Sequence, residues 1–204
     1  PNGHFPHNPE PLKEHLGDLS AQVIESDADF GLVVDPDVDR LAFMDENGAM
    51  FGEEYTLVAC ADYVLSKTPG NTVSNMSSTR ALRDVTEKHG GTYYSSAVGE
   101  VNVVTKMKAV SAVIGGEGNG GIIDPQLHYG RDSLIGTALF LSLLSTSKLS
   151  VSELKKTYPE YFMGKGKIQL EPTMDVDAFL LAIEKKYANN KPNTIDGVKI
   201  DFEA

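Results

Sequence analysis

The sequence is poor in cationic residues. Its 204 residues include 18 Lys and Arg against 29 Asp and Glu, for a formal net charge of -11, and only four are arginine (Arg40, Arg80, Arg83 and Arg131). An acidic chain with no basic cluster repels polyanions, which excludes nucleic acid and anionic membrane surfaces as partners. If its ligand is itself an anion, such a chain needs a metal ion or a few well-placed cations to hold it.

Cysteine and long apolar runs are also scarce. The single Cys60 cannot form an internal disulfide, which is typical of a reducing cytosol. It lies in the apolar stretch LVACADYVL, so we expect it in the core rather than as a nucleophile. No apolar run approaches a membrane span, and the opening PNGHFPHNPEP lacks the features of a signal peptide. These features predict a cytoplasmic protein.

The sequence does contain a regular alternation of apolar segments. With 41% hydrophobic residues it has material for a packed core of one or two domains. Helices are predicted at 10–26, 54–67, 78–89, 100–109 and 133–145. Strands are predicted at 30–34, 41–44, 72–76, 92–96 and 112–115, the first of them buried. This order predicts an α/β fold of layered units with mixed sheets.

The final part of the chain has a different pattern. A capping box is predicted at 150–153, followed by a strand at 167–171 and a helix at 176–187 that Asp175 caps. Asp196 and Gly197 then suit a tight hairpin turn. Neither this segment nor the opening one has enough apolar residues for its own core, so we interpret the sequence as a fragment of a longer protein.

Three aspartates follow the predicted strand at 30–34. Asp35, Asp37 and Asp39 alternate along one short loop, and a hard divalent cation would relieve their mutual repulsion. Magnesium fits, because it takes oxygen ligands at about 2.0–2.1 Å and keeps positions free for phosphate or water. Arg40 would stand beside the metal as a fixed donor to an anionic substrate.

The same residues allow other interpretations of this loop. It could be an acidic turn held by local hydrogen bonds. Asp35, Asp37, Asp39 and Glu46 match positions of a calcium-binding EF-hand, but Arg40 stands where glycine is required and strand patterns flank the loop. A phosphatase of the haloacid dehalogenase type predicts a hydroxyl residue where Asp39 stands.

A glycine-rich loop at 115–121 follows the strand predicted at 112–115. Its G-x-G-x-x-G spacing suggests dinucleotide binding, but the segment after it contains Pro125 and does not open a helix. The loop instead presents Glu117 and Asn119, an acceptor and an amide that suit vicinal hydroxyl groups. The alternative is a tight turn whose glycines only supply positive φ.

Four motifs, in this order, resemble those of the α-D-phosphohexomutase family: GHFPHNPEPL, DPDVDR, GEGNGG and DGVKIDFE. The resemblance implies that this chain is the middle part of a four-domain enzyme. Residues 1–50 would be the latter part of the second domain with the metal loop, and residues 51–163 the third domain with the sugar-binding loop. Residues 164–204 would be the linker and first elements of the C-terminal phosphate-binding domain.

The resemblance also implies a reaction and a site. A phosphoryl group would move between the 6- and 1-positions of a hexose through a phosphoserine and a bisphosphorylated intermediate. The implied residues are Asp35, Asp37 and Asp39 as Mg²⁺ ligands, Arg40 beside the transferring phosphate, and Glu117, Gly118 and Asn119 as substrate contacts, with Glu100 and Arg131 as further substrate candidates. The partners would be the phosphosugar and the missing domains.

Several positions depart from the family pattern. Pro36 replaces a usual glycine, Asn119 stands where serine is common, and Gly121 where many members have histidine. Glu100 could instead simply begin a helix, and Asp132, which follows Arg131, could be an N-cap.

The missing parts decide what the fragment can do. The segment PHNP has no serine to phosphorylate, and without a donor or a final phosphate clamp the fragment alone should be inactive. The GEGNGG loop resembles that of phosphoglucosamine mutases, with phosphomannomutase or phosphoglucomutase as the alternative. A phosphatase and a non-catalytic sugar-binding module stay open as other classes.

Overall fold

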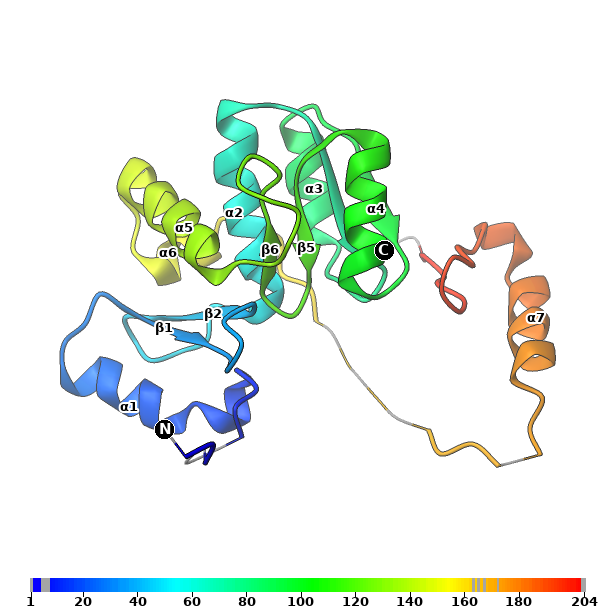
Figure 1. Ribbon diagram of the computed structural model, residues 1–204, viewed down its shortest axis with the longest axis horizontal. Coiled ribbons are helices and arrows are strands. Elements are labelled where there is room, and N and C mark those ends of the chain that lie inside the picture. Colours follow the sequence, from blue (N-terminus) through cyan, green and yellow to red (C-terminus); the bar gives the residue numbers. More distant parts are fainter. Residues whose placement is uncertain are drawn as a thin grey trace.

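The computed structural model describes residues 2–4, 8–162, 164, 166, 168–171 and 173–202. Helices and strands alternate along most of this length, and the predicted α/β class with mixed sheets is confirmed. Residues 164, 166 and 168–171 form no helix or strand, and α7 (Val176–Lys186) lies apart from the two sheets and their helices (Figure 1). No described helix combines the length and the apolar character that crossing a bilayer requires.

The first unit is a two-stranded antiparallel sheet packed on one helix. β1 (Phe30–Val34) pairs with β2 (Leu41–Asp45), and α1 (Gly17–Glu25) covers the pair. The single helix predicted at 10–26 is wrong at its start, where a 3-10 turn (Lys13–His15) comes first. Leu16 separates the two because its backbone, with φ of -113° and ψ of 24°, leaves the helical conformation, and Gly17 after it is a weak helix former.

The sequence predicts that β1 is buried, but its partner β2 is the buried strand. All five residues of β2 are buried, whereas in β1 only Gly31 is, and Leu32 is 42% exposed. Each strand of this sheet has one strand partner, and β2 is the buried one because α2, α5 and α6 pack against it, which apolar composition alone did not reveal.

The second unit is a four-stranded mixed sheet in the order β4-β3-β5-β6. Its strands are β3 (Asn71–Asn75), β4 (Tyr93–Ser96), β5 (Ala112–Glu117) and β6 (Gly121–Ile123), and only the β5–β6 pair is antiparallel. Its helices are α2 (Glu53–Lys67), α3 (Ala81–Lys88), α4 (Glu100–Val110), α5 (Ser133–Ser147) and α6 (Val151–Lys155). The helices predicted in this region are confirmed to within a few residues at their ends.

Helices cover both faces of this sheet. Ile114 and Ile122 join a large core with α2, α3 and α5, while Val73 and Ile123 pack with α4 on the other face. Cys60 lies fully buried on α2, where its Sγ donates to the carbonyl oxygen of Gly136 at 3.4 Å, and burial raises the pKa of its thiol. Its expected place in the core is confirmed.

The glycine-rich segment is a hairpin rather than a long loop. β5 continues to Glu117, and Glu117 pairs with Gly121 at the start of β6, which leaves only residues 118–120 outside the strands. The expectation of a strand ending at 115 and a loop over 115–121 is therefore wrong. Two buried residues, Ile122 and Ile123, supply the missing strand.

The C-terminal segment keeps local features without a core. Asp175 caps α7 through a hydrogen bond from the Ala178 amide, as predicted, and the capping box at 150–153 is also confirmed. Residues 168–171 form no strand, and position 167 of that prediction lies outside the described residues. The final hairpin is reduced to one bridge between Asn193 and Lys199 around Gly197. None of the residues of α7 is buried, because no second layer packs on it here.

Candidate metal and sugar-binding site

The aspartate loop, residues 35–40, connects β1 to β2. The Asp35 side chain organises it, since Asp35 Oδ1 accepts from the amides of Asp39 at 3.1 Å and Arg40 at 3.0 Å. The Val38 amide donates to the Asp35 carbonyl at 3.1 Å, and Val38 has a φ of 60°. Positive φ is unfavourable for a β-branched residue, so the surrounding contacts hold this turn in place.

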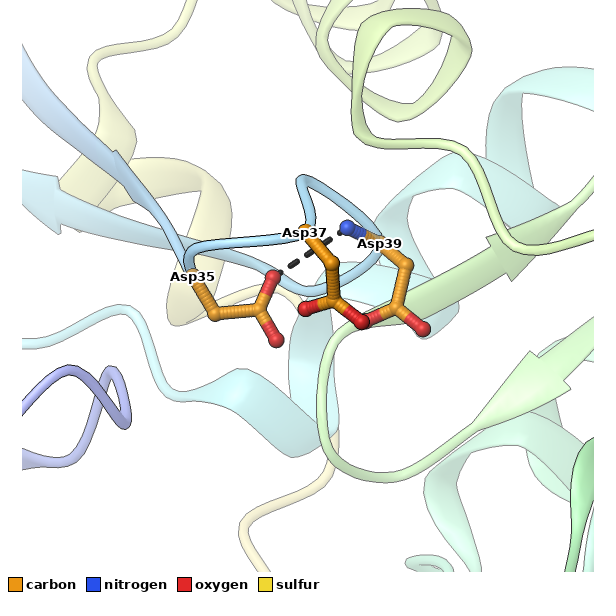
Figure 2. Close-up of side chains that lie close together, drawn as sticks. All are labelled: Asp35, Asp37 and Asp39. Atoms are coloured by element: carbon orange, nitrogen blue, oxygen red, sulfur yellow. Dashed lines mark hydrogen bonds between the residues drawn. The ribbon is translucent and has the colours of Figure 1, made fainter. Parts of the chain in front are cut away.

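The three carboxylates of this loop gather together. Asp35, Asp37 and Asp39 each offer an oxygen within 4.8 Å of the others, and in Figure 2 they extend toward the same side of the loop. Asp35 is buried, Asp39 half-buried and Asp37 exposed. Burial raises the pKa of Asp39, the charge of Arg131 opposes this, and the charges of Asp35 and Asp37 raise it further. Such an oxygen set fits a hard divalent cation.

Arg40 faces acidic groups. Its buried Nε lies 3.4 Å from Asp35 Oδ2 and has no hydrogen-bond acceptor among the described residues. Its Nη1 donates to Glu10 Oε1 at 3.2 Å. A cavity of about 50 Å³ lies beside it, between the aspartate loop and the glycine segment. The residues that line the cavity are Glu10, Pro11, Leu12, Arg40, Glu53 and Asn119.

The EF-hand alternative fails on geometry as well as on sequence. Strands flank the aspartate loop on both sides. Glu46 Oε1 accepts from the hydroxyls of Ser152 at 2.5 Å and Ser150 at 2.7 Å, so this carboxylate is bound to the N-terminus of α6.

The glycine hairpin, residues 117–121, touches the strand that follows the aspartate loop. The Leu41 amide donates to the Gly120 carbonyl at 3.0 Å. A Cβ on Gly120 would lie 2.2 Å from the Leu41 carbonyl oxygen, and the φ of Gly120 is 89°, so both contact and conformation require glycine. The Gly118 amide donates to Ser78 Oγ at 2.9 Å. The fold therefore brings the two predicted loops together.

Glu117 is buried at the end of β5 and already has several partners. Its Oε1 accepts from Asn75 Nδ2 at 2.8 Å and from the Gly99 amide at 3.2 Å, and its Oε2 accepts from Arg131 at 2.9 Å. A carboxylate has about four acceptor positions, so one is left on Oε2. The expectation that it could accept from two neighbouring hydroxyls holds only if a present partner leaves. Asn119 Oδ1 accepts from the Gly121 amide at 3.3 Å.

Arg131 lies among three carboxylates instead of standing free for a phosphate. Its Nε donates to Glu100 Oε2 at 2.9 Å, its Nη1 donates to Glu117, and its Nη2 pairs with Asp39 Oδ2. Burial by itself would lower the pKa of this guanidinium, but the hydrogen bond to Glu100 and the three acidic charges raise it. The sequence suggested a substrate contact here, and nothing in it indicated these partners.

The remaining candidates have structural partners as well. Glu100 is the first residue of α4 and pairs with Arg131. Asp132 is the N-cap of α5, since its side chain accepts from the amides of Leu134 at 2.8 Å and Ile135 at 3.0 Å. The Ile135 hydrogen bond is the main cause that lowers the pKa of Asp132.

Sequence reasoning missed the polar residues after β3. Asn75 Oδ1 accepts from Ser77 Oγ at 3.0 Å and Ser78 Oγ at 2.7 Å, which orients the amide that donates to Glu117. β3 and β5 are parallel neighbours, so their carboxyl ends meet at one edge of the sheet. The run NMSS at 75–78, which begins inside the strand predicted at 72–76 and continues past its end, was the signal that could have found them.

Two family models match the chain. The model described as Phosphoglucomutase/phosphomannomutase, alpha/beta/alpha domain III, matches residues 52–161. The model for alpha/beta/alpha domain II of the same description matches residues 1–48.

Curated relatives and a solved structure match over almost the whole chain. A Phosphoglucomutase/phosphomannomutase from Thermococcus kodakarensis is 34% identical over 205 residues, covering 100% of this chain and 45% of the relative. A protein named Probable phosphoglucosamine mutase from Methanopyrus kandleri is 31% identical, covering 100% and 46%. The chain thus spans about half the length of the curated relatives it matches. A crystal structure of a Phosphoglucomutase/phosphomannomutase family protein from Burkholderia thailandensis superposes with a TM-score of 0.78 at 25% identity, covering 96% of this chain and 43% of that one.

Proposed function

Because the chain belongs to the phosphoglucomutase/phosphomannomutase family, we propose that the complete protein interconverts hexose 6-phosphate and hexose 1-phosphate as an intramolecular phosphotransferase. The observation that carries the proposal is the contact between its two loops. The carboxylates of the aspartate loop gather within 4.8 Å, and the Leu41 amide binds the Gly120 carbonyl of the glycine hairpin at 3.0 Å. A phosphate-handling loop and a hydroxyl-binding loop are thereby neighbours.

The aspartate loop suits Mg²⁺ as the cofactor. Asp35, Asp37 and Asp39 would be its ligands, since hard oxygen donors gathered at one point are the set that this cation prefers. Bound Mg²⁺ would neutralise charge on a phosphoryl group, which is the main requirement of phosphoryl transfer. Arg40 borders the adjoining cavity and would supply a second positive charge there.

The glycine hairpin would hold the sugar. Glu117 keeps one acceptor position for a hydroxyl while Asn75 and the Gly99 amide fix its other oxygen. Asn119 lines the same cavity as Arg40, and Gly118, between Glu117 and Asn119, has no side chain and so leaves room for the Glu54 carboxylate. Glu100 and Arg131 would support this site through contacts with Glu117 and the aspartate loop.

The division into domains and the substrate are part of the proposal. We assign residues 1–50, 51–163 and 164–204 to the second domain, the third domain and the start of the fourth, and the two model matches support the first two. Phosphoglucosamine is the proposed substrate class, supported by the name of the Methanopyrus kandleri relative. The Thermococcus kodakarensis relative supports phosphomannose or phosphoglucose as the alternative. A haloacid dehalogenase-type phosphatase is not favoured, and a cytoplasmic location stays a prediction.

An assay of the complete protein tests this function. Purified enzyme with Mg²⁺ is given glucosamine, mannose and glucose 6-phosphates, and formation of each 1-phosphate is followed. We expect turnover with glucosamine 6-phosphate above the other two, loss of turnover with a chelator, and no turnover by the 204-residue chain alone. Release of inorganic phosphate from a simple ester by this chain alone would instead indicate a phosphatase.

A further inference from the structure

One guanidinium joins the aspartate loop to the glycine hairpin. Arg131 uses its Nη2 for Asp39, its Nη1 for Glu117 and its Nε for Glu100, and its side chain is 15% exposed. The three acidic groups come from a loop, a strand end and the first turn of α4. Because the guanidinium fork is planar and rigid, it cannot approach one of these carboxylates without moving relative to the others.

Hydrogen bonds hold the backbone next to Arg131 to β6 and to the aspartate loop. The Asp132 amide donates to the Ile122 carbonyl of β6 at 2.9 Å. Ser133 Oγ donates to the Val38 carbonyl of the aspartate loop at 2.8 Å. The side chain therefore starts from a fixed point, and its freedom lies mainly in the position of the guanidinium.

Gly121 has no side chain and therefore leaves room for the side chain of Arg131. A Cβ on Gly121 would lie 2.3 Å from Arg131 Cδ, which is too close for two carbon atoms. Gly121 does not have a positive φ, so its backbone would accept alanine. Glycine is required at this position by the passing side chain and not by the conformation of the chain.

The charges around Arg131 are unbalanced. Six carboxylates, those of Glu10, Asp35, Asp37, Asp39, Glu100 and Glu117, lie around two guanidinium groups, those of Arg40 and Arg131. A divalent cation at the aspartate loop would compete with Arg131 for the charge of Asp39 and repel the guanidinium. Arg131 would then be held by Glu117 and Glu100 alone.

We propose that Arg131 is a positioning residue that couples cation binding at the aspartate loop to the orientation of Glu117 in the glycine hairpin. The inference rests on the proposed function, because it takes Mg²⁺ to be the cation of the aspartate loop. When the cation binds, the guanidinium gives up part of its contact with Asp39 and tightens on Glu117. The hydroxyl-binding carboxylate is then fixed only when the metal loop is loaded.

Nuclear magnetic resonance of the 204-residue chain titrated with Mg²⁺ alone tests this coupling. In the wild type, the amide signals of residues 118–121 should shift with the same saturation curve as those of the aspartate loop. In Arg131→Met the cation should bind about tenfold more tightly, because a nearby positive charge is gone. In this variant the amide signals of residues 118–121 should no longer shift with the saturation curve of Mg²⁺ binding. A residue that only stabilises the fold would weaken both responses together.

Arg40→Met is the matched control for charge. It removes a guanidinium that faces Asp35, so the cation should again bind more tightly, but the hairpin response should persist. Gly121→Ala is the second variant, since it keeps both charges and displaces the Arg131 side chain. It should abolish the hairpin response without the gain in affinity.

The outcomes separate this inference from the proposed function. A hairpin that still responds in both Arg131→Met and Gly121→Ala would overturn the coupling, and would assign it to the Leu41–Gly120 contact instead. Mg²⁺ binding by the wild type with no hairpin response would overturn the coupling alone. No Mg²⁺ binding by the wild type would overturn the metal loop of the proposed function and the coupling with it.

Discussion

The amide of Leu41 donates to the carbonyl oxygen of Gly120 at 3.0 Å, so the first residue of β2 touches the tip of the glycine hairpin. The two residues are far apart in the sequence: Leu41 belongs to the two-stranded sheet, and Gly120 lies in the turn between β5 and β6 of the four-stranded sheet. Their contact brings the aspartate loop, which ends one residue before Leu41, to the residues that we propose bind the hydroxyl groups of the sugar. The hairpin can approach this closely because Gly120 has no side chain.

Gly120→Ala tests how strongly this contact supports the site. Its methyl group would lie 2.2 Å from the Leu41 carbonyl oxygen, and its φ of 89° is unfavourable for alanine. We expect a loss of about 3 kcal/mol in the free energy of unfolding, from strain and overpacking together. Urea denaturation of the 204-residue chain measures this loss.

The matched control for this substitution is Gly90→Ala. Gly90 also has positive φ, at 76°, but nothing lies within 4 Å of its Cβ position. It should lose only about 1–2 kcal/mol, the cost of the backbone conformation. Equal losses at the two positions would mean that the Leu41 contact contributes nothing.

Asp37→Asn should separate metal binding from stability. Removing one of three gathered carboxylates relieves repulsion, so the chain without metal should keep or slightly raise its melting temperature. Mg²⁺ affinity should fall about tenfold or more, which corresponds to about 1.4 kcal/mol of binding free energy. Calorimetric titration and thermal melting with and without Mg²⁺ measure the two effects.

Asp29→Asn is the control for the same change of charge. Asp29 is exposed just before β1 and is not one of the three gathered carboxylates. Its substitution should leave Mg²⁺ affinity near the wild-type value. If the two variants bound Mg²⁺ equally well, Asp37 would not be a ligand.

Glu46 should make the stability of the chain depend on acidic pH. Burial opposes ionisation of this group, but hydrogen bonds from Ser152 and Ser150 lower the pKa of Glu46 from 4.5 to about 2. Its ionised form therefore stabilises the fold fully above pH 4.5, and this contribution disappears as the pH falls through about 2. Glu46→Gln should flatten the decline in unfolding free energy over this range, measured by urea denaturation at several pH values.

A carboxylate without these partners provides the comparison. Glu25 is an exposed residue at the end of α1, and Glu25→Gln should keep the wild-type dependence on pH. A Glu46→Gln variant with an unchanged acid profile would show that the link from Glu46 to α6 does not stabilise the folded chain.

Most of the elements could be predicted because their signals are local. Asp175 and residues 150–153 carry capping patterns that form wherever the chain is placed, and both caps are present. The predictions failed where packing decides. β1 proved to be mostly unburied, β6 directly follows a glycine-rich turn and was not predicted, and the segment at 168–171 formed no strand.

The sequence by itself determined the α/β class and the gathering of three carboxylates on one short loop, because both follow from neighbours along the chain. Only the tertiary structure decided what faces that loop. Arg131 reaches Asp39 and Glu117 because β6 and the N-cap of α5 fix its backbone while Gly121 leaves room for its side chain. Contacts between such distant residues depend on how the elements pack, and no local pattern records them.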